Sequence, residues 1–103
     1  MDINKLKATI ENGKIQWQRH ALERMMEKGI SRNTVKKILL SGELIEDYPD
    51  DKPYPSNLIL GFRNKRPLHL VVAKDNQTGQ CIMVTVYEPD KKSWSLDFKF
   101  KIK

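Results

Sequence analysis

Apolar positions near the start of the chain recur with the spacing of an α-helix. Ile3, Leu6 and Ile10 lie three or four positions apart, with charged residues between them. This spacing predicts a short amphipathic helix over residues 3–12. Gly13 then provides a stop signal, because glycine is common just after the C-terminus of a helix.

Two further helices are predicted before residue 42. The first begins at Arg19 and ends at Gly29, a glycine C-cap. The second begins after Ser31, whose hydroxyl can accept a hydrogen bond from the first helical turn, and it ends before Gly42. Trp17 falls in the connection that precedes the first of these helices, where we expect it to pack against the core.

After residue 42 the apolar period changes from about 3.6 to about 2, which is the spacing of half-buried strands. The alternation predicts strands over residues 43–48, 57–63, 67–74, 80–87 and 96–102. The second and third of them flank a polar, basic turn and predict a hairpin at the centre of the sheet. The proline-rich residues 49–56 indicate a loop, and the last strand would lie at an edge with a lysine face.

Helices followed by strands indicate an α+β domain. The helical part spans residues 3–41 and the sheet part spans residues 43–102, so residues 1–103 form a single domain with one modest core. We expect two to three N-terminal helices to pack on one face of a four- to five-stranded, mainly antiparallel sheet.

The charge of the chain favours a polyanionic partner. Nineteen Lys and Arg residues against 13 Asp and Glu residues give a formal net charge of +6 and a pI near 9.5. The charge is uneven, because residues 43–52 hold five acids and one lysine, whereas residues 91–103 hold five lysines and one acid. RNA, DNA or an acidic protein would complement the basic segments.

Nothing in the sequence indicates secretion or membrane insertion. The start of the chain lacks the apolar core of a signal peptide, and no apolar run approaches the roughly 20 residues that a membrane-spanning helix needs. Cys81 is the single cysteine and lies in an apolar run, so we expect a buried thiol in a reducing compartment. These features predict a cytoplasmic protein without a cofactor, a structural zinc site or a catalytic metal.

The first pattern that could carry chemistry is a row of His20, Arg24 and Lys28. Residues four apart share one face of a helix, so an imidazole, a guanidinium and an ammonium could meet a phosphate together. The same row is also what a solvated stripe beside the apolar face of the helix looks like, and spacing alone favours that interpretation. The spacing still leaves both interpretations open.

His69 is the second histidine and stands in an otherwise apolar run. In a strand it shares a face with Val71 and Ala73, while its neighbours Leu68 and Leu70 share the other face. Both faces look buried. His69 therefore either packs in the core or, because an imidazole titrates near neutrality, transfers protons.

The strand over residues 80–87 ends in two further candidates, Thr85 and Tyr87. Regular alternation would point them to the same side as Cys81 and Met83. A tyrosine at a strand end can donate a hydrogen bond to a phosphate or cover the core with its ring. The pattern does not choose between these roles.

Metal-independent cleavage of RNA requires side chains of these types. A base activates the ribose 2′-hydroxyl, cations stabilise the phosphorane, and an acid protonates the leaving oxygen. We assign His20 or His69 as base or acid. Arg24 would stabilise the phosphorane and Tyr87 would orient the phosphate. The cations expected to bind the RNA backbone are Lys28, Arg63, Lys65, Arg66, Lys99 and Lys101.

Short segments spread over most of the chain carry a resemblance to a known family. Four of them are His20-Ala-x-x-Arg24, Gly29-Ile-Ser31, Gly42-Glu-Leu-Ile-Glu-Asp-Tyr48 and Thr85-Val-Tyr87-x-Pro89. Two more, typical of one subgroup, are Tyr54-Pro-Ser-x-Leu58-x-Leu60-Gly61 and Arg66-Pro-Leu-His69. These segments resemble the bacterial family of domains of unknown function numbered 4258, and the resemblance covers roughly residues 17–98.

The resemblance implies a fold, a partner and a set of site positions. Members of this family are grouped with ribonucleases of the barnase, EndoU, colicin and RelE-like fold, in which an N-terminal helical part precedes a four-stranded antiparallel sheet. Some resemble toxins encoded beside a zinc-finger antitoxin, which implies a cognate antitoxin protein as partner. By this resemblance His20, Arg24, Thr85 and Tyr87 are active-site positions, and His69 joins them in the subgroup.

One position departs from the family pattern. Lys28 stands where the family often has arginine before Gly-Ile-Ser. Lysine keeps the charge but loses the bidentate fork that binds a phosphate.

The sequence therefore predicts an endoribonuclease of toxin type, with two alternatives from other classes. In the first alternative, residues 63–66 and the lysine face of the last strand bind RNA without cleaving it. In the second, the acidic residues 46–51 dock a partner protein. The sequence leaves the oligomeric state open. An open cleft shared by both histidines would favour the catalytic interpretation.

Overall fold

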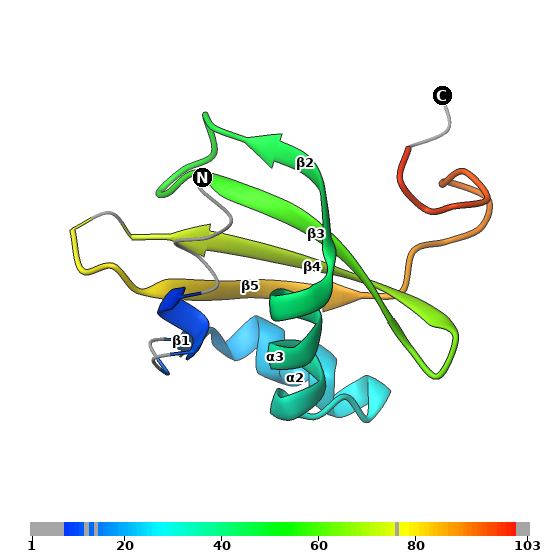
Figure 1. Cartoon of the computed structure of the whole chain (residues 1–103), viewed down its shortest axis with the longest axis horizontal. Helices are drawn as coiled ribbons and strands as arrows, with labels where there is room; N and C mark the ends of the chain where they lie inside the picture. The colour runs from blue at the N-terminus through cyan, green and yellow to red at the C-terminus, as the bar shows by residue number, and fades with distance from the viewer. Residues whose placement is uncertain (1–7, 12, 14, 76, 101–103) are drawn as a thin grey trace.

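A five-stranded sheet with helices on one side organises the chain. The structure, a computed structural model, describes residues 8–11, 13, 15–75 and 77–100. Its elements are β1 (Ile15–Trp17), α2 (Arg19–Lys28), α3 (Arg32–Ser41), β2 (Glu43–Tyr48), β3 (Ser56–Arg63), β4 (Arg66–Lys74) and β5 (Cys81–Tyr87). The strand order is β1-β5-β4-β3-β2, antiparallel except between β1 and β5 (Figure 1). The predicted α+β class and the mainly antiparallel sheet are confirmed.

Helices α2 and α3 begin and end where the sequence predicts. Gly29 ends α2 with a φ of 64°, a left-handed conformation that glycine adopts without steric cost. Ser31 caps α3, since its Oγ accepts a hydrogen bond from the N–H of Thr34 at 3.1 Å. Of the predicted helix over residues 3–12, the structure describes a helical turn at residues 8–11, and the rest lies outside the described residues.

The predicted connection around Trp17 is wrong, because Trp17 ends the strand β1. This strand pairs in parallel with β5, with Trp17 opposite Met83. Three residues are too short for an alternation pattern, and a parallel partner from the far part of the chain leaves no local signal. Trp17 nevertheless packs against the core as predicted, and the guanidinium carbon of Arg32 lies 5.5 Å from its ring centroid.

Strands β3 and β4 form the predicted central hairpin. Its two-residue turn consists of Asn64 and Lys65, with φ values of 50° and 69°. Positive φ at both central residues matches the twist of a tight hairpin turn. The tip of the hairpin therefore projects the polar, basic residues between Arg63 and Arg66.

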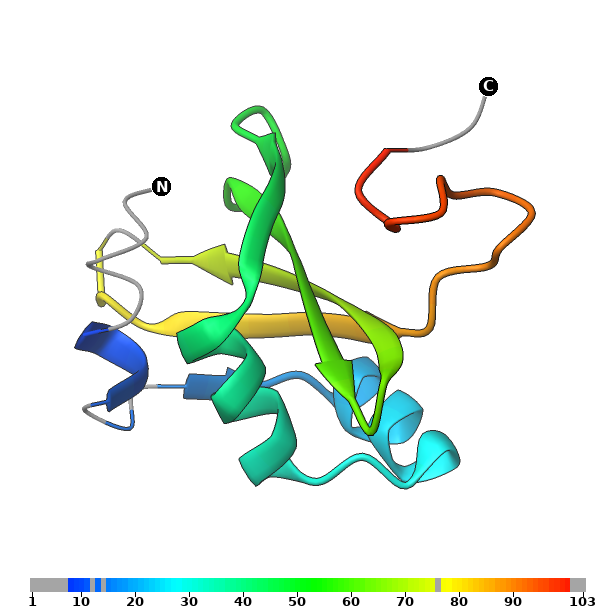
Figure 2. The same ribbon diagram turned by 45° about the vertical axis from the view of Figure 1, so that its right-hand side comes forward.

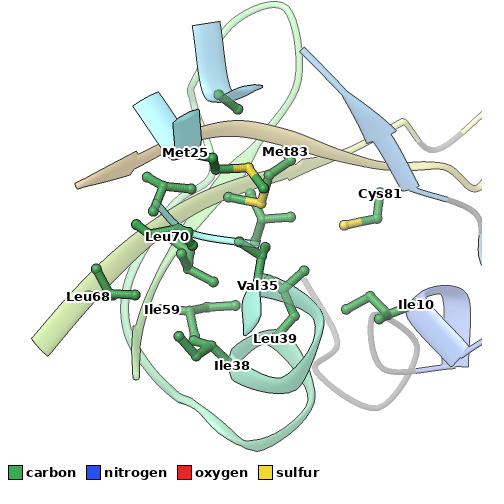
Figure 3. Close-up of a cluster of buried hydrophobic side chains, with 14 residues drawn as sticks. Ile10, Met25, Val35, Ile38, Leu39, Ile59, Leu68, Leu70, Cys81 and Met83 are labelled. Atoms are coloured by element: carbon green, nitrogen blue, oxygen red, sulfur yellow. The ribbon is translucent and has the colours of Figure 1, made fainter. Parts of the chain in front are cut away.

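The main core lies between the helices and one face of the sheet, which we call the helix face (Figures 1 and 3). Leu68, Leu70 and Val72 of β4 join this core, as the predicted strand geometry requires. Buried apolar side chains from both helices and from the neighbouring strands complete it, including Met25, Val35, Ile38, Leu39, Ile59 and Met83.

The last predicted strand, residues 96–102, is wrong. Residues 95–100 form turns, and residues 101–103 lie outside the described residues. Two features oppose a strand there. The carboxylate of Asp97 accepts hydrogen bonds from the Ser95 hydroxyl and the Lys99 N–H, and Phe98 has a left-handed φ of 62°. In the described part of the chain, the fifth strand of the sheet is β1 and not the predicted C-terminal strand.

Residues 89–100 follow β5 and lie on the side of the sheet opposite to the helices, and we call them the C-terminal strap (Figures 1 and 2). We call this side of the sheet the strap face. Cross-strand partners share a face, so the register places Leu60, His69 and Tyr87 together on the strap face. The sheet is thus covered by helices on one side and partly by the strap on the other.

Candidate functional site

The structure divides the predicted catalytic residues between two places. His20 and Arg24 lie on α2, whereas His69 and Tyr87 lie on the strap face of the sheet. Within the described ranges, no hydrogen bond or ion pair joins His20 or Arg24 to His69 or Tyr87. The two groups therefore form two separate candidate sites.

The row on α2 is exposed. His20, Arg24 and Lys28 all lie on the solvent side of the helix, whose buried residues are Ala21 and Met25. The Nη1 of Arg24 lies 2.8 Å from a carboxylate oxygen of Glu27, so this guanidinium already has an anionic partner. The row is a polar surface that a ligand can reach.

A β-bulge in β5 decides where Thr85 points. Adjacent residues of β4 pair with Thr85 and with Met83, so Val84 is an extra residue without a partner in the ladder. The alternation of β5 reverses across this bulge: Cys81 and Met83 face the helices, whereas Thr85 and Tyr87 face the strap. The prediction that all four point to one side is wrong, because a bulge leaves no mark in the apolar pattern.

A chain of three groups runs through His69. The imidazole is 0% exposed, its Nε2 lies 2.8 Å from the carbonyl oxygen of Phe98, and its Nδ1 lies 3.2 Å from the hydroxyl oxygen of Tyr87. A carbonyl can only accept, so in the neutral ring Nε2 carries the hydrogen and Nδ1 accepts from the hydroxyl of Tyr87. The result is a hydroxyl–imidazole–carbonyl chain with one defined tautomer.

The strap closes over His69 with an aromatic ring and a backbone carbonyl. The ring centroid of Trp94 lies 4.4 Å from that of His69, edge to face at 84°. Phe98 has a φ of 62°, which is rare for a bulky residue and requires support from its surroundings. That support comes from Ser95, whose carbonyl accepts from the Phe98 N–H at 2.9 Å, and whose N–H donates to Phe100 at 2.8 Å.

Burial keeps the hydroxyl and the imidazole of this chain neutral. Burial lowers the pKa of His69, and the hydrogen bond to the Phe98 carbonyl opposes this effect more weakly. Burial also raises the pKa of Tyr87, with a smaller contribution from Tyr48. At neutral pH the proton therefore resides on the hydroxyl of Tyr87, which donates a hydrogen bond to the unprotonated Nδ1 of His69.

The cross-strand row of the sheet that contains His69 ends in an ion pair at the edge strand β2. His69 lies between Tyr87 and Leu60, and Leu60 pairs with Glu43 of β2. The Nζ of Lys99, in the strap, lies 2.9 Å from a carboxylate oxygen of Glu43, and this contact raises the pKa of Lys99. The strap is thus fixed to the sheet at His69 and at Glu43.

The predicted cations of the turn gather at the hairpin tip. Arg63 donates from Nη1 to the carbonyl of Gly29 at 2.8 Å and from Nη2 to that of Lys28 at 3.2 Å, so it satisfies carbonyls at the end of α2. Arg66 pairs with Glu88 at 3.1 Å and is 67% exposed. Lys65 is exposed beside them, so the tip is positively charged and open to a ligand.

A cavity of about 720 Å³ brings cations from distant parts of the chain together. It lies between α3 and the hairpin, and its lining includes Lys37, Arg63 and Lys99. Arg63 and Lys99 were predicted from separate segments, and the fold places both at one surface. Lys101, the remaining predicted cation, lies outside the described residues.

Several residues of this region were not predicted. Trp94 and the carbonyl of Phe98 contact His69, and Glu88 and Glu43 pair with cations. A Ser-x-Asp segment at 95–97 is a turn signal that could have argued against the last strand, but no local pattern reveals that this turn meets His69.

Neither a metal-binding cluster nor a membrane-spanning helix is found among the described residues. No three His, Cys, Asp or Glu side chains among them lie close enough together to hold a metal ion. None of the helices found among the same residues has the length and apolarity to span a membrane.

Comparison with known proteins gives one match. The family model described as Domain of unknown function (DUF4258) matches residues 17–88, which is more than half of the chain. The matched region begins at the end of β1 and ends at Glu88, immediately before the strap. None of the curated proteins and none of the solved structures in the comparison matches the chain.

Proposed function

This chain belongs to the family of the domain of unknown function DUF4258, and from its strap face we propose that it is an endoribonuclease that cleaves RNA by transfer to the ribose 2′-hydroxyl. The reacting side chain is Tyr87, with His69 as its proton acceptor. The basic tip of the hairpin holds the RNA backbone. This proposal keeps the predicted reaction, retains His69 and Tyr87 of the predicted catalytic set, and leaves out His20 and Arg24, which lie apart on α2.

The hydroxyl–imidazole–carbonyl chain is the observation that carries the proposal. A hydroxyl within hydrogen-bond reach of an imidazole, which is oriented in turn by a third group, is the arrangement of an activated hydroxyl. Here the hydroxyl of Tyr87 lies 3.2 Å from Nδ1, and the carbonyl of Phe98 fixes the ring from the other nitrogen. Tyr87 is half-buried while His69 is fully buried, so Tyr87 is the member that RNA can reach.

The proton balance of the reaction closes within this pair. The 2′-hydroxyl gives its proton to the oxygen of Tyr87 while the hydroxyl proton of Tyr87 moves to Nδ1 of His69. The 2′-oxygen forms its bond to phosphorus, and the bond from phosphorus to the 5′-oxygen breaks. The imidazolium then returns the proton through Tyr87 to the 5′-oxygen. The products are a 2′,3′-cyclic phosphate and a 5′-hydroxyl, and the carbonyl of Phe98 stabilises the intermediate imidazolium.

Positive charge near the hairpin supports the binding step. A phosphorane carries more negative charge than the phosphodiester, so exposed cations beside it lower the barrier. Arg66 and Lys65 lie at the end of β4 from which His69 projects, three and four residues away. Glu46 and Asp47 of the edge strand β2 pair with Leu58 and Asn57, away from the hairpin tip, so RNA would approach from the tip.

The proposal includes a cellular setting. An RNA-cleaving protein of toxin type works in the cytoplasm, where a cognate antitoxin can restrain it. The buried thiol of Cys81 suits a reducing compartment, since burial raises its pKa to about 12 and leaves it unreactive.

Cleavage of RNA in EDTA by the purified protein is the direct test. We expect a fluorescent single-stranded RNA to give products that end in a 2′,3′-cyclic phosphate, and an equivalent DNA to remain intact. Tyr87→Phe removes only the hydroxyl and should slow cleavage by about 10²–10⁴-fold, as loss of an acid–base group does. Mass spectrometry of the products identifies the new ends.

Two matched variants sharpen this test. Tyr54→Phe removes the hydroxyl of another tyrosine, one that interacts with Asp75 beyond the far end of β4 from Arg66, and should leave the rate unchanged. His20→Ala tests the predicted contribution of α2, and we expect it to retain cleavage. Intact RNA with the wild-type protein, or equal rates for Tyr87→Phe and wild type, would contradict the proposal.

Binding of RNA without cleavage is the second candidate function. The complete burial of His69, with both nitrogens already paired, favours it, because such an imidazole also fits a purely structural role. This candidate predicts salt-dependent affinity that falls in Arg66→Ala and Lys65→Ala and is unchanged in Tyr87→Phe. Filter binding at two salt concentrations, on RNA that stays intact, separates it from the first.

A further inference from the structure

A second cavity lies between the hairpin and the C-terminal strap. It has a volume of about 510 Å³, within the range of roughly 300–1,000 Å³ that small-ligand sites occupy. Pro67, Trp94, Leu96 and Phe98 supply its apolar lining. Leu96 is 101% exposed, so a large apolar side chain stands uncovered at this cavity.

The charged lining of this cavity is mainly positive. Lys65, Arg66 and Lys91 line it together with a single carboxylate, that of Glu88. Arg66 and Glu88 pair with each other, which leaves the two lysines to attract an anion. A ligand that suits this lining has a flat apolar part and a negatively charged part.

We propose that this cavity binds one ribonucleotide of an RNA strand, with the base against Trp94 and Leu96 and the phosphate at Lys65 and Lys91. Stacking on an aromatic side chain accepts any base, and lysines hold the backbone beside it. The assignment rests on the proposed function only in taking RNA as the ligand.

Trp94 connects this cavity to the reaction centre. Its ring lines the cavity and also contacts the ring of His69, with a centroid distance of 4.4 Å. A base stacked on Trp94 therefore lies one ring away from the Tyr87–His69 pair. This placement would bring the adjoining phosphodiester toward the hydroxyl of Tyr87.

A nucleotide titration followed by nuclear magnetic resonance tests the site without any cleavage step. With uridine and guanosine 5′-monophosphates, we expect saturable shifts of the Trp94 indole N–H and the Leu96 methyl groups. Trp17, on β1, is an internal reference that should not shift. Inorganic phosphate should shift neither the Trp94 indole nor the Leu96 methyl groups. Equal shifts at Trp17, or unchanged Trp94 and Leu96 signals, would overturn the assignment.

Matched surface variants test the lining. Leu96→Ala should weaken nucleotide binding on the order of 5–10-fold, whereas Met26→Ala, which removes another highly exposed apolar side chain, should not. Lys91→Ala should weaken nucleotide binding by a similar factor. Lys92→Ala should not, because Lys92 does not line the cavity. Equal affinities in all four variants would reject the site.

The outcomes separate this site from the proposed reaction. If nucleotides bind at Trp94 but RNA stays intact, the nucleotide site stands and the endoribonuclease proposal fails. If RNA is cleaved and Tyr87→Phe blocks cleavage, but nucleotides shift signals elsewhere, the reaction stands and this site fails.

Discussion

Leu70 and His69 are neighbours in one strand, and their surroundings show how the two faces of the sheet differ. Both are 0% exposed. Leu70 points to the helix face and belongs to the apolar core cluster, whereas His69 points to the strap face and needs a partner for each nitrogen. Burial stabilises the first residue directly, but the second only through the hydrogen bonds that the strap and Tyr87 provide.

The two faces therefore contribute differently to stability. On the helix face, apolar area removed from water supplies the stabilisation, and this area belongs to helices and strands that form together. On the strap face Leu58 and Leu60 are also buried, but the strap itself is joined to His69 by a hydrogen bond, and such a bond adds only about 0.5–1.5 kcal/mol net. The strap, which contributes no side chain to the main core cluster, is thus the segment that can change with least effect on the fold, and this suits a ligand site.

Truncation of a core residue should give the largest effect and establish the helix face as the source of stability. Leu70→Ala leaves a cavity among packed side chains, and we expect it to lower the free energy of unfolding by about 2–5 kcal/mol. Leu96→Ala on the strap should change it by less than about 0.5 kcal/mol, because that side chain is fully exposed. Urea denaturation of both variants makes the comparison, and equal losses would refute it.

Removal of the ring over His69 should have a smaller effect on stability and a specific effect on the imidazole. Trp94→Ala removes a half-buried ring and its edge-to-face contact, so we expect a loss of about 1–2 kcal/mol. Water would then reach His69, and its pKa should rise toward the ordinary value of about 6.5. A magnetic resonance titration of the ring protons measures this, and an unchanged pKa would show that the strap does not cause the shift.

The smallest effect that we predict is a pH dependence of stability. Burial lowers the pKa of His69 in the folded chain. Below about pH 6.5, His69 of the unfolded chain therefore binds a proton, whereas His69 of the folded chain stays neutral until the pH is lower. The contribution of His69 is therefore complete above about pH 6.5 and is lost as the pH falls toward its lowered pKa.

Denaturation at pH 7.5 and at pH 5.5 measures this difference. Wild type should lose more stability between these values than His69→Gln does. His20→Ala, at an exposed position, should retain the wild-type difference. A loss that persists unchanged in His69→Gln would assign the effect to another group.

Local patterns predicted most of the fold. Gly29, Ser31 and the Asn64-Lys65 turn act through their own backbone or through a neighbour a few residues away, so the sequence alone locates them. The strands β2 to β5 follow from alternation for the same reason. Two parts of the fold were not predicted correctly. Strand β1 is too short to show a period. The end of the strap alternates like a strand, although Asp97 and Phe98 bend it into turns.

The candidate site was predicted as a list of residues but not as an arrangement. His69 and Tyr87 were both named, and the register of β4 and β5 joins them. His20 and Arg24 were named with them, but they lie apart on α2. Helical spacing reports only the face of the helix on which a side chain lies, and the partner of that face depends on contacts between segments far apart in the chain.

The sequence by itself determined the α+β class, the two helices, the central hairpin and the positive charge, because each depends on composition or on neighbours within a few residues. Only the tertiary structure decided the surroundings of His69. The bulge at Val84 turned Tyr87 to the strap face, and the strap carried the Phe98 carbonyl to the imidazole. Both depend on register and chain reversal over long separations, where hydrogen bonds between distant residues outweigh local preference.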